Sequence, residues 1–266
     1  MVLNNVSRAG LQWERDELIL AFELYCTLRT PNSVSNPQVI TLAEAIGRDA
    51  GAVKMKLENF KKFDPSYTAN GRKGLGNAGK LDGEVVSEFI NNWGDLAWEA
   101  ENARKRYSME PGPDILEGEF DIPEGRYKER AVRTRQGQRM FREILLAKYR
   151  GKCCITGLAA EDLLKASHIK PWAVSDDATE KANPQNGLLL NPFFDLAFDM
   201  GYITIDTDYK VVLSGEIRRT NESTRSYFEK FEGRRIDLPT EVIFRPGIQF
   251  IEYHNDHVFD KRTIRA

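Results

Sequence analysis

His168 and two later aspartates are the residues of this chain whose types and spacing suggest hydrolytic chemistry. The sequence contains three histidines, and His168 is the only one before position 254. An imidazole takes and releases a proton near neutral pH, so His168 is a candidate general base. Asp195 and Asp199 are four positions apart, and in a helix both carboxylates would point from one face, where they could bind a hard cation. A base beside a bound cation can activate a water molecule, which is suited to hydrolysis.

The segments around these residues predict two strands followed by a helix. His168 ends one short stretch, and Asn186 opens an apolar run, so both stretches are expected to be strands. Asn191 is expected to cap the helix, with Pro192 at its first position and Gly201 as its stop. A strand ending in histidine, a strand beginning with asparagine and a helix bearing acids together indicate a metal site.

Several motifs in this part of the chain resemble those of the HNH endonuclease family, in its bacterial restriction-type branch. They are an RxGQxxFR stretch (Arg135–Arg142), a cysteine turn (Cys153–Gly157), an AxHIxPW strand end (Ala166–Trp172), an NGLLL strand (Asn186–Leu190) and a DxxFDxG helix (Asp195–Gly201). The resemblance extends from near Arg126 to the C-terminus. It implies a ββα-metal fold that holds a single divalent cation against the scissile phosphodiester of DNA.

The resemblance also implies a role for each site residue. His168 would be the general base, and Asn186 would either brace the loop behind it by hydrogen bonds or reach the metal. Asp195 would be the leading metal ligand, at a position where many relatives carry a histidine. Asp199 is a second candidate ligand, the alternative being a hydrogen bond at the helix end. Ser167 stands where many relatives place an acid or a second histidine, which leaves the full ligand set open.

Mg²⁺ is the expected cation, with Mn²⁺ as the alternative. Structural zinc is not expected, because the three cysteines form no CxxC pair. Arg135, Gln138, Arg142 and Lys170 are candidate contacts to the DNA backbone. His254 and His257 are spaced as a second pair of metal ligands could be, but an edge or packing role is favoured.

Composition excludes several classes of protein. With 266 residues, 41% hydrophobic and 29% charged, the chain has the composition of a soluble globular protein that can bury real cores. It contains no apolar run of membrane-spanning length and no apolar leader, so we expect a cytoplasmic protein with reduced cysteines and no membrane partner.

The first hundred residues predict a helical domain. Residues 11–29 carry Leu18, Phe22 and Tyr25 on one face of an amphipathic helix. Residues 39–63 predict two short helices with a glycine-containing turn, similar to a helix-turn-helix. Its second helix bears Lys54 and Lys56, which could contact DNA or could simply be solvated.

Charge distribution predicts the domain boundaries. Residues 108–125 contain six acids and no base, whereas residues 126–152 contain ten bases and two acids. The sequence therefore predicts an α+β protein with a helical DNA- or partner-binding domain (1–107), an acidic linker (108–125) and a nuclease domain (126–266). The basic block would be either a phosphate-binding surface or a solvated helix face.

The function that these features predict is metal-dependent cleavage of DNA, of a restriction or defence type. Two alternatives are a DNA-binding protein whose HNH core has decayed and a non-specific nuclease of the toxin type. Cutting two strands with one active site per chain favours a homodimer.

Overall fold

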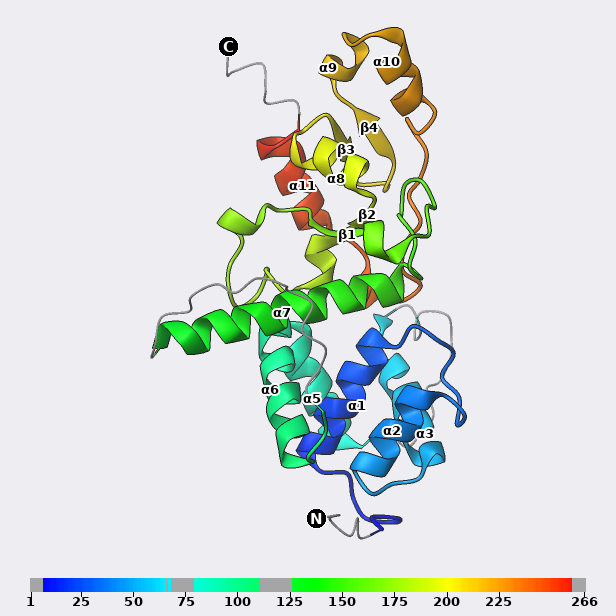
Figure 1. Cartoon of the computed structure of the whole chain (residues 1–266), viewed down its shortest axis with the longest axis vertical. Helices are drawn as coiled ribbons and strands as arrows, with labels where there is room; N and C mark the ends of the chain where they lie inside the picture. The colour runs from blue at the N-terminus through cyan, green and yellow to red at the C-terminus, as the bar shows by residue number, and fades with distance from the viewer. Residues whose placement is uncertain (1–6, 66, 68–78, 111–125, 260–266) are drawn as a thin grey trace. The chain divides into compact units, whose positions relative to one another are not determined.

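The computed structural model describes residues 7–65, 67, 79–110 and 126–259, which divide into two compact units (Figure 1). The first unit comprises residues 1–144, 177–183 and 241–243, and the second comprises residues 145–176, 184–240 and 244–266. Helices are combined with small antiparallel sheets, so the expected α+β class is confirmed.

The first unit is built around one enclosed helix. Its elements are α1 (Arg15–Thr27), α2 (Pro37–Ala45), α3 (Ala50–Phe60), η1 (Lys61–Phe63), α5 (Lys80–Ile90), α6 (Trp93–Arg106) and the part of α7 (Arg126–Lys148) up to Ile144. Helix α1 packs against α2, α3, α5 and α6, and every residue from Glu17 to Cys26 is buried. The prediction of a single apolar face was therefore too narrow, because a helix covered on all sides has no solvent face.

Aromatic rings fill the space around α1. The Phe22 ring lies edge-on to Phe60, with centroids 5.3 Å apart, and stacks on Trp93 at 6.2 Å. All three side chains are almost completely buried. Rings from α1, α3 and α6 thus share one core, and their burial supplies much of the hydrophobic stabilisation of the unit.

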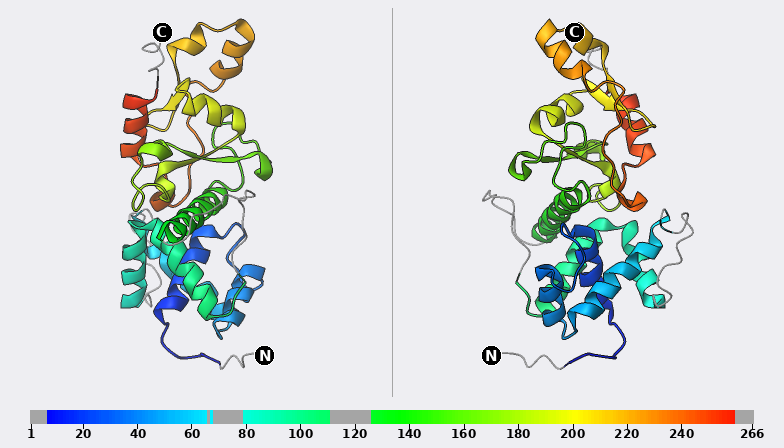
Figure 2. Two further views of the ribbon diagram at one scale, coloured as in Figure 1. Left: turned by 60° about the vertical axis from the view of Figure 1, so that its left-hand side comes forward. Right: turned by 90° about the vertical axis from the view of Figure 1, so that its right-hand side faces the viewer.

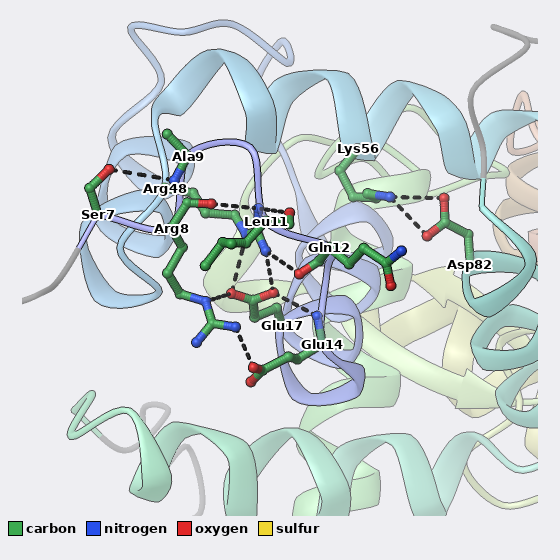
Figure 3. Close-up of polar contacts among 10 residues, drawn as sticks. All are labelled: Ser7, Arg8, Ala9, Leu11, Gln12, Glu14, Glu17, Arg48, Lys56 and Asp82. Atoms are coloured by element: carbon green, nitrogen blue, oxygen red, sulfur yellow. Dashed lines mark hydrogen bonds and ion pairs between the residues drawn. The ribbon is translucent and has the colours of Figure 1, made fainter.

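Arg48 fixes the turn between α2 and α3 through a buried network (Figure 3). Its guanidinium donates to both carboxylate oxygens of Glu17, at 3.1 and 2.7 Å. The remaining donors bind the carbonyl oxygens of Arg8, Leu11 and Gln12 at 2.9–3.3 Å. A fully buried carboxylate needs such a partner, because an unpaired buried charge is strongly destabilising. Arg48 therefore ties the chain before α1 to the turn.

The two short helices have conventional caps. Asn36 accepts from the Gln38 N–H to cap α2, and Asp49 accepts from the Ala52 N–H to cap α3, both at 2.9 Å. Gly47 lies between the helices with φ +69°, a conformation that favours glycine. Local sequence signals thus account for where both helices begin.

Lys56 on α3 is buried in an ion pair with Asp82 on α5 (Figure 3). Its Nζ lies 2.8 and 2.9 Å from the two carboxylate oxygens, and 4.9 Å from the ring centroid of Trp13. Asp82 also accepts from the Gly79 N–H at the start of α5. In this structure Lys56 joins two helices and does not face solvent, which is a structural role instead of the predicted DNA contact.

The second unit contains two β-hairpins and several short helices. The first hairpin pairs β1 (Lys165–His168) with β2 (Gly187–Leu190), and the second pairs β3 (Ile203–Ile205) with β4 (Val211–Leu213). The helical elements are η2 (Glu161–Leu163), η3 (Trp172–Val174), η4 (Pro184–Asn186), α8 (Pro192–Asp199), α9 (Gly215–Arg218), α10 (Glu222–Glu229), η5 (Val242–Phe244, which spans both units) and α11 (Ile248–His257). Helix α8 packs on β1, β2 and β3, and α11 packs on β3 (Figure 2).

Helix α8 begins and ends where the sequence predicts. The Asn191 side chain accepts from the Phe193 and Phe194 N–H groups at 3.1 and 3.0 Å, and Pro192 occupies the first turn. Gly201 follows the helix with φ +68°. A short hairpin of β3 and β4 follows the helix.

The compact units do not coincide with the domains expected from charge, since residues 126–144 group with the N-terminal helices. Independent folding of residues 1–107 and 126–266 stays a prediction. Of the expected acidic linker, residues 111–125 lie outside the described part of the chain. In the part that is described, no helix is both long and apolar enough to span a membrane.

We predict that Lys56→Met destabilises the first unit by about 3 kcal/mol, because it leaves the Asp82 carboxylate buried without its cation. Urea unfolding followed by tryptophan fluorescence measures this. Lys54→Met is the matched control, since Lys54 is a partly exposed lysine on the same helix and should change stability by less than about 0.5 kcal/mol. Equal effects of the two substitutions would contradict a structural role for Lys56.

Candidate active site

His168 is the last residue of β1 and lies opposite Gly187, the first residue of β2. Its side chain is half-buried, and its ring stands edge-on to Trp172 with centroids 5.2 Å apart. The next residue, Ile169, donates its N–H to the Asn186 carbonyl at 3.0 Å. The antiparallel ladder and the Trp172 ring therefore orient the imidazole, which a general base requires.

Asn186 is completely buried and closes the loop that follows His168. Its Oδ1 accepts from the Lys170 N–H at 2.7 Å. Its Nδ2 donates to the Lys170 carbonyl at 3.3 Å and to Ser175 Oγ at 3.2 Å. Ser175 Oγ in turn donates to the carbonyls of Lys170 and Pro171. Of the two roles that the sequence left open for Asn186, these bonds favour bracing.

Asp195 and Asp199 lie on successive turns of α8, as the spacing predicts. Partial burial of its carboxyl group, followed by the negative charge of Asp195, raises the pKa of Asp199 to about 6. The two carboxylates thus repel one another, which a bound cation would relieve. Two neighbouring carboxylates suit Mg²⁺ or Mn²⁺, whose remaining positions are filled by water and substrate oxygens.

In the described residues, no group of three or more histidine, cysteine, aspartate or glutamate side chains could hold a metal ion. Ser167 is buried, and its Oγ has no hydrogen-bond partner among the described residues. A buried hydroxyl without a partner is costly, so Ser167 is a reasonable site for a water or ligand contact.

His254 supports α8 from α11 through partners that the local sequence did not reveal. Its Nε2 lies 3.1 Å from the Phe198 carbonyl oxygen, and its Nδ1 lies 2.8 Å from Thr204 Oγ1. The ring stacks on Phe198 with centroids 3.7 Å apart, and burial lowers the pKa of His254 to about 4. The favoured packing role is confirmed for His254. The local sequence does not indicate the partners of His254, because they lie at least 50 positions away along the chain.

The cysteine turn supports the start of α8. Cys153 and Cys154 are buried free thiols, and the Cys154 N–H donates to the Leu189 carbonyl on β2 at 2.9 Å. The Asn191 side chain donates to Thr156 Oγ1 at 3.1 Å. The turn that the sequence singled out is thus bonded to both β2 and the helix cap.

The candidate DNA contacts are distributed over both units. Lys170, in the second unit, places its Nζ 5.2 Å from the ring centroid of Tyr253. Arg135, Gln138 and Arg142 lie on the part of α7 that belongs to the first unit, and all three are half-buried. Lys54 is half-buried on α3. The structure therefore shows no single cluster within one unit that contains all of them.

Several arginines of the basic helix α7 are neutralised within the first unit. Arg130 pairs with Asp177, Arg133 contacts Asp95 at 3.2 Å, and Arg139 lies 3.7 Å from Glu101. These pairs link α7 to other parts of the unit. Part of the basic block thus has a structural role, which neither of the two interpretations of the sequence anticipated.

Comparison with known proteins identifies the ββα region. Residues 153–206 match a family model described as HNH endonuclease. The match contains β1, β2 and α8 together with His168, Asn186, Asp195 and Asp199. No curated protein sequence matches the chain. The second unit therefore contains an HNH domain, whose family is one of nucleases.

The raised pKa of Asp199 predicts a pH-dependent stability of the metal-free protein. An unfolded aspartate titrates near pH 3.9, so ionising Asp199 costs the folded state free energy as the pH rises through about 6. Asp199→Asn should be more stable than wild type at pH 7.5, by up to about 1 kcal/mol given the exposure of the side chain. The difference should disappear as the pH falls to about 4.

Urea unfolding in the presence of EDTA at several pH values measures this difference. Asp208→Asn is the control, because Asp208 lies in an exposed turn of the same unit and its side chain is 76% exposed. A pH-independent difference between Asp199→Asn and wild type would show that the carboxyl group titrates normally.

Proposed function

We propose that this protein is a metal-dependent DNA endonuclease of a restriction or defence type. The observation that carries the proposal is the placement of His168 at the end of β1, in the same ββα segment as the two carboxylates of α8 and within the region that matches the HNH endonuclease family. A base and an acidic cation site on one small scaffold are suited to hydrolysis of a phosphodiester.

His168 is proposed as the general base. It would accept a proton from the attacking water, since it is the one histidine of the ββα segment and its ring is oriented by Trp172. Asn186 would keep the loop after His168 in place through its bonds to Lys170 and Ser175. Asn186 is thus a positioning residue in this proposal.

Asp195 and Asp199 are proposed as the ligands of one divalent cation, Mg²⁺ or Mn²⁺. When bound, such a cation neutralises charge that develops on the phosphate and on the leaving oxygen. The two carboxylates would hold it through oxygen atoms on one side of α8. Lys170 would contribute positive charge for binding the DNA backbone.

The first unit is proposed to bind DNA through a helix-turn-helix formed by α2 and α3. Its support is the capped pair of short helices joined by the turn that contains Gly47 and Arg48. Lys54, Arg135, Gln138 and Arg142 remain candidate contacts, whereas Lys56 is left out because it is buried against Asp82. Such a module would select where the nuclease domain cuts.

His168→Ala should reduce cleavage of plasmid DNA by 10²–10⁴-fold with Mg²⁺ or Mn²⁺, because it removes the proposed base. Fold and DNA affinity should be unchanged. His257→Ala is the matched control, since His257 is an exposed histidine of the same unit, stacked on Tyr253. Cleavage by His168→Ala within about threefold of wild type would overturn the role of His168. An inactive wild type would instead favour the decayed-core alternative.

Asp195→Ala should weaken Mn²⁺ binding and abolish cleavage, because it removes one of the two proposed ligands. Asp195→His should restore part of both, since imidazole is also a ligand for Mn²⁺. Calorimetric titration of Mn²⁺ into each variant measures affinity, and Asp208→Ala serves as a control for loss of an exposed carboxylate. An unchanged Mn²⁺ affinity in Asp195→Ala would place the metal elsewhere.

A further inference from the structure

Helix α8 has an exposed apolar stripe beside its carboxylates. Phe193, Leu196 and Met200 follow one another at helical spacing, and all three are exposed despite their size. Leu196 is 58% exposed, more than any other large hydrophobic residue in the described chain. Single exposed apolar residues are ordinary, but a contiguous stripe indicates a binding surface.

The stripe forms one wall of a depression of about 330 Å³. Its other lining residues include Ile217 of α9 and Thr224 and Phe228 of α10, and all of them belong to the second unit. Tyr227 extends the apolar area on α10, where its ring contacts Phe193 edge-on at 5.3 Å. We call this area, formed by the α8 stripe with Ile217, Thr224, Tyr227 and Phe228, the α8–α10 surface.

The charges around the α8–α10 surface argue against nucleic acid as its occupant. Residues 215–232 contain four acids and four bases, a net charge of zero. The three arginines of this segment are paired with glutamates, as Arg218–Glu232, Arg219–Glu216 and Arg225–Glu222. A phosphate backbone is attracted by uncompensated positive charge. An apolar centre beside a polar rim whose arginines are already paired is instead typical of a protein–protein interface.

We propose that the α8–α10 surface binds the same surface of a second copy of this chain. Residues 215–232 carry no net charge and their arginines are paired within the chain, so this part of the rim can face its own copy across a two-fold axis without net repulsion while the apolar centres meet. The choice of a second copy rests on the proposed DNA cleavage: the described part of each chain has one ββα site, and two copies would supply one site for each strand. The stripe lies on α8 with the carboxylates, so this pairing would place each proposed active site next to the dimer interface.

Sedimentation velocity of the full-length protein, with and without a DNA duplex, tests this proposal. Wild type should form a dimer, and Leu196→Glu and Thr224→Lys should each raise the dimer dissociation constant at least about 30-fold. The two substitutions add opposite charges. If both weaken dimerisation, the cause cannot be a changed electrostatic interaction with the carboxylates of α8. Leu163→Glu is the matched control, because Leu163 lies in η2 of the same unit and is 57% exposed.

Three results would overturn the assignment: a wild type that stays monomeric with and without DNA, variants that dimerise as wild type does, or an equal loss in Leu163→Glu. Circular dichroism melts of each variant exclude misfolding as the cause. Because sedimentation does not depend on catalysis, failure of the proposed interface can be distinguished from failure of the proposed function. A dimer that leaves DNA intact refutes the proposed function alone, whereas a monomer that cuts DNA refutes the α8–α10 interface alone.

Discussion

The buried amide of Asn186 is the constraint on which the arrangement of the ββα segment depends. It bonds both the N–H and the carbonyl of Lys170, and it reaches Ser175 Oγ as well. His168 lies two positions before Lys170, and Asn186 leads directly into β2 and from there into α8. One side chain therefore fixes the position of the loop after the proposed base relative to the strand that leads into α8. An apolar residue at position 186 would leave several buried polar groups without partners, at a cost of about 1–3 kcal/mol each.

In the first unit, buried ion pairs hold the elements together, as the buried amide of Asn186 does in the ββα segment. Glu17 and Glu23 project from the enclosed helix α1, and they pair with Arg48 and Arg104. Such pairs contribute little net stability, yet each partner is strongly required once the other is buried. Many basic residues of this unit are consequently engaged with acids of the same unit. Its count of lysines and arginines therefore overstates the positive charge that is left for a nucleic acid.

Features specified by neighbouring residues could be predicted from the sequence. The cap at Asn191, the stop at Gly201 and the two strands at His168 and after Asn186 follow from local patterns, and the structure contains all of them. The buried state of Lys56 and the support of α8 by His254 could not be predicted. Each depends on a partner far along the chain, Asp82 in one case and Phe198 in the other. Periodicity reports which face of a segment is apolar and not how many neighbours surround it, which is why the enclosure of α1 was also missed.

The support of α8 at both ends has a consequence for how this site would respond to chelators. A helix this short is unstable in isolation, but Asn191 caps its start and His254 binds the carbonyl of Phe198 near its end. Its carboxylates are therefore spaced by the fold before any ion arrives. In zinc fingers the metal organises the polypeptide, and stripping it unfolds the domain. Here the scaffold would survive demetallation, so EDTA should act as a reversible inhibitor and readdition of cation should restore turnover without refolding.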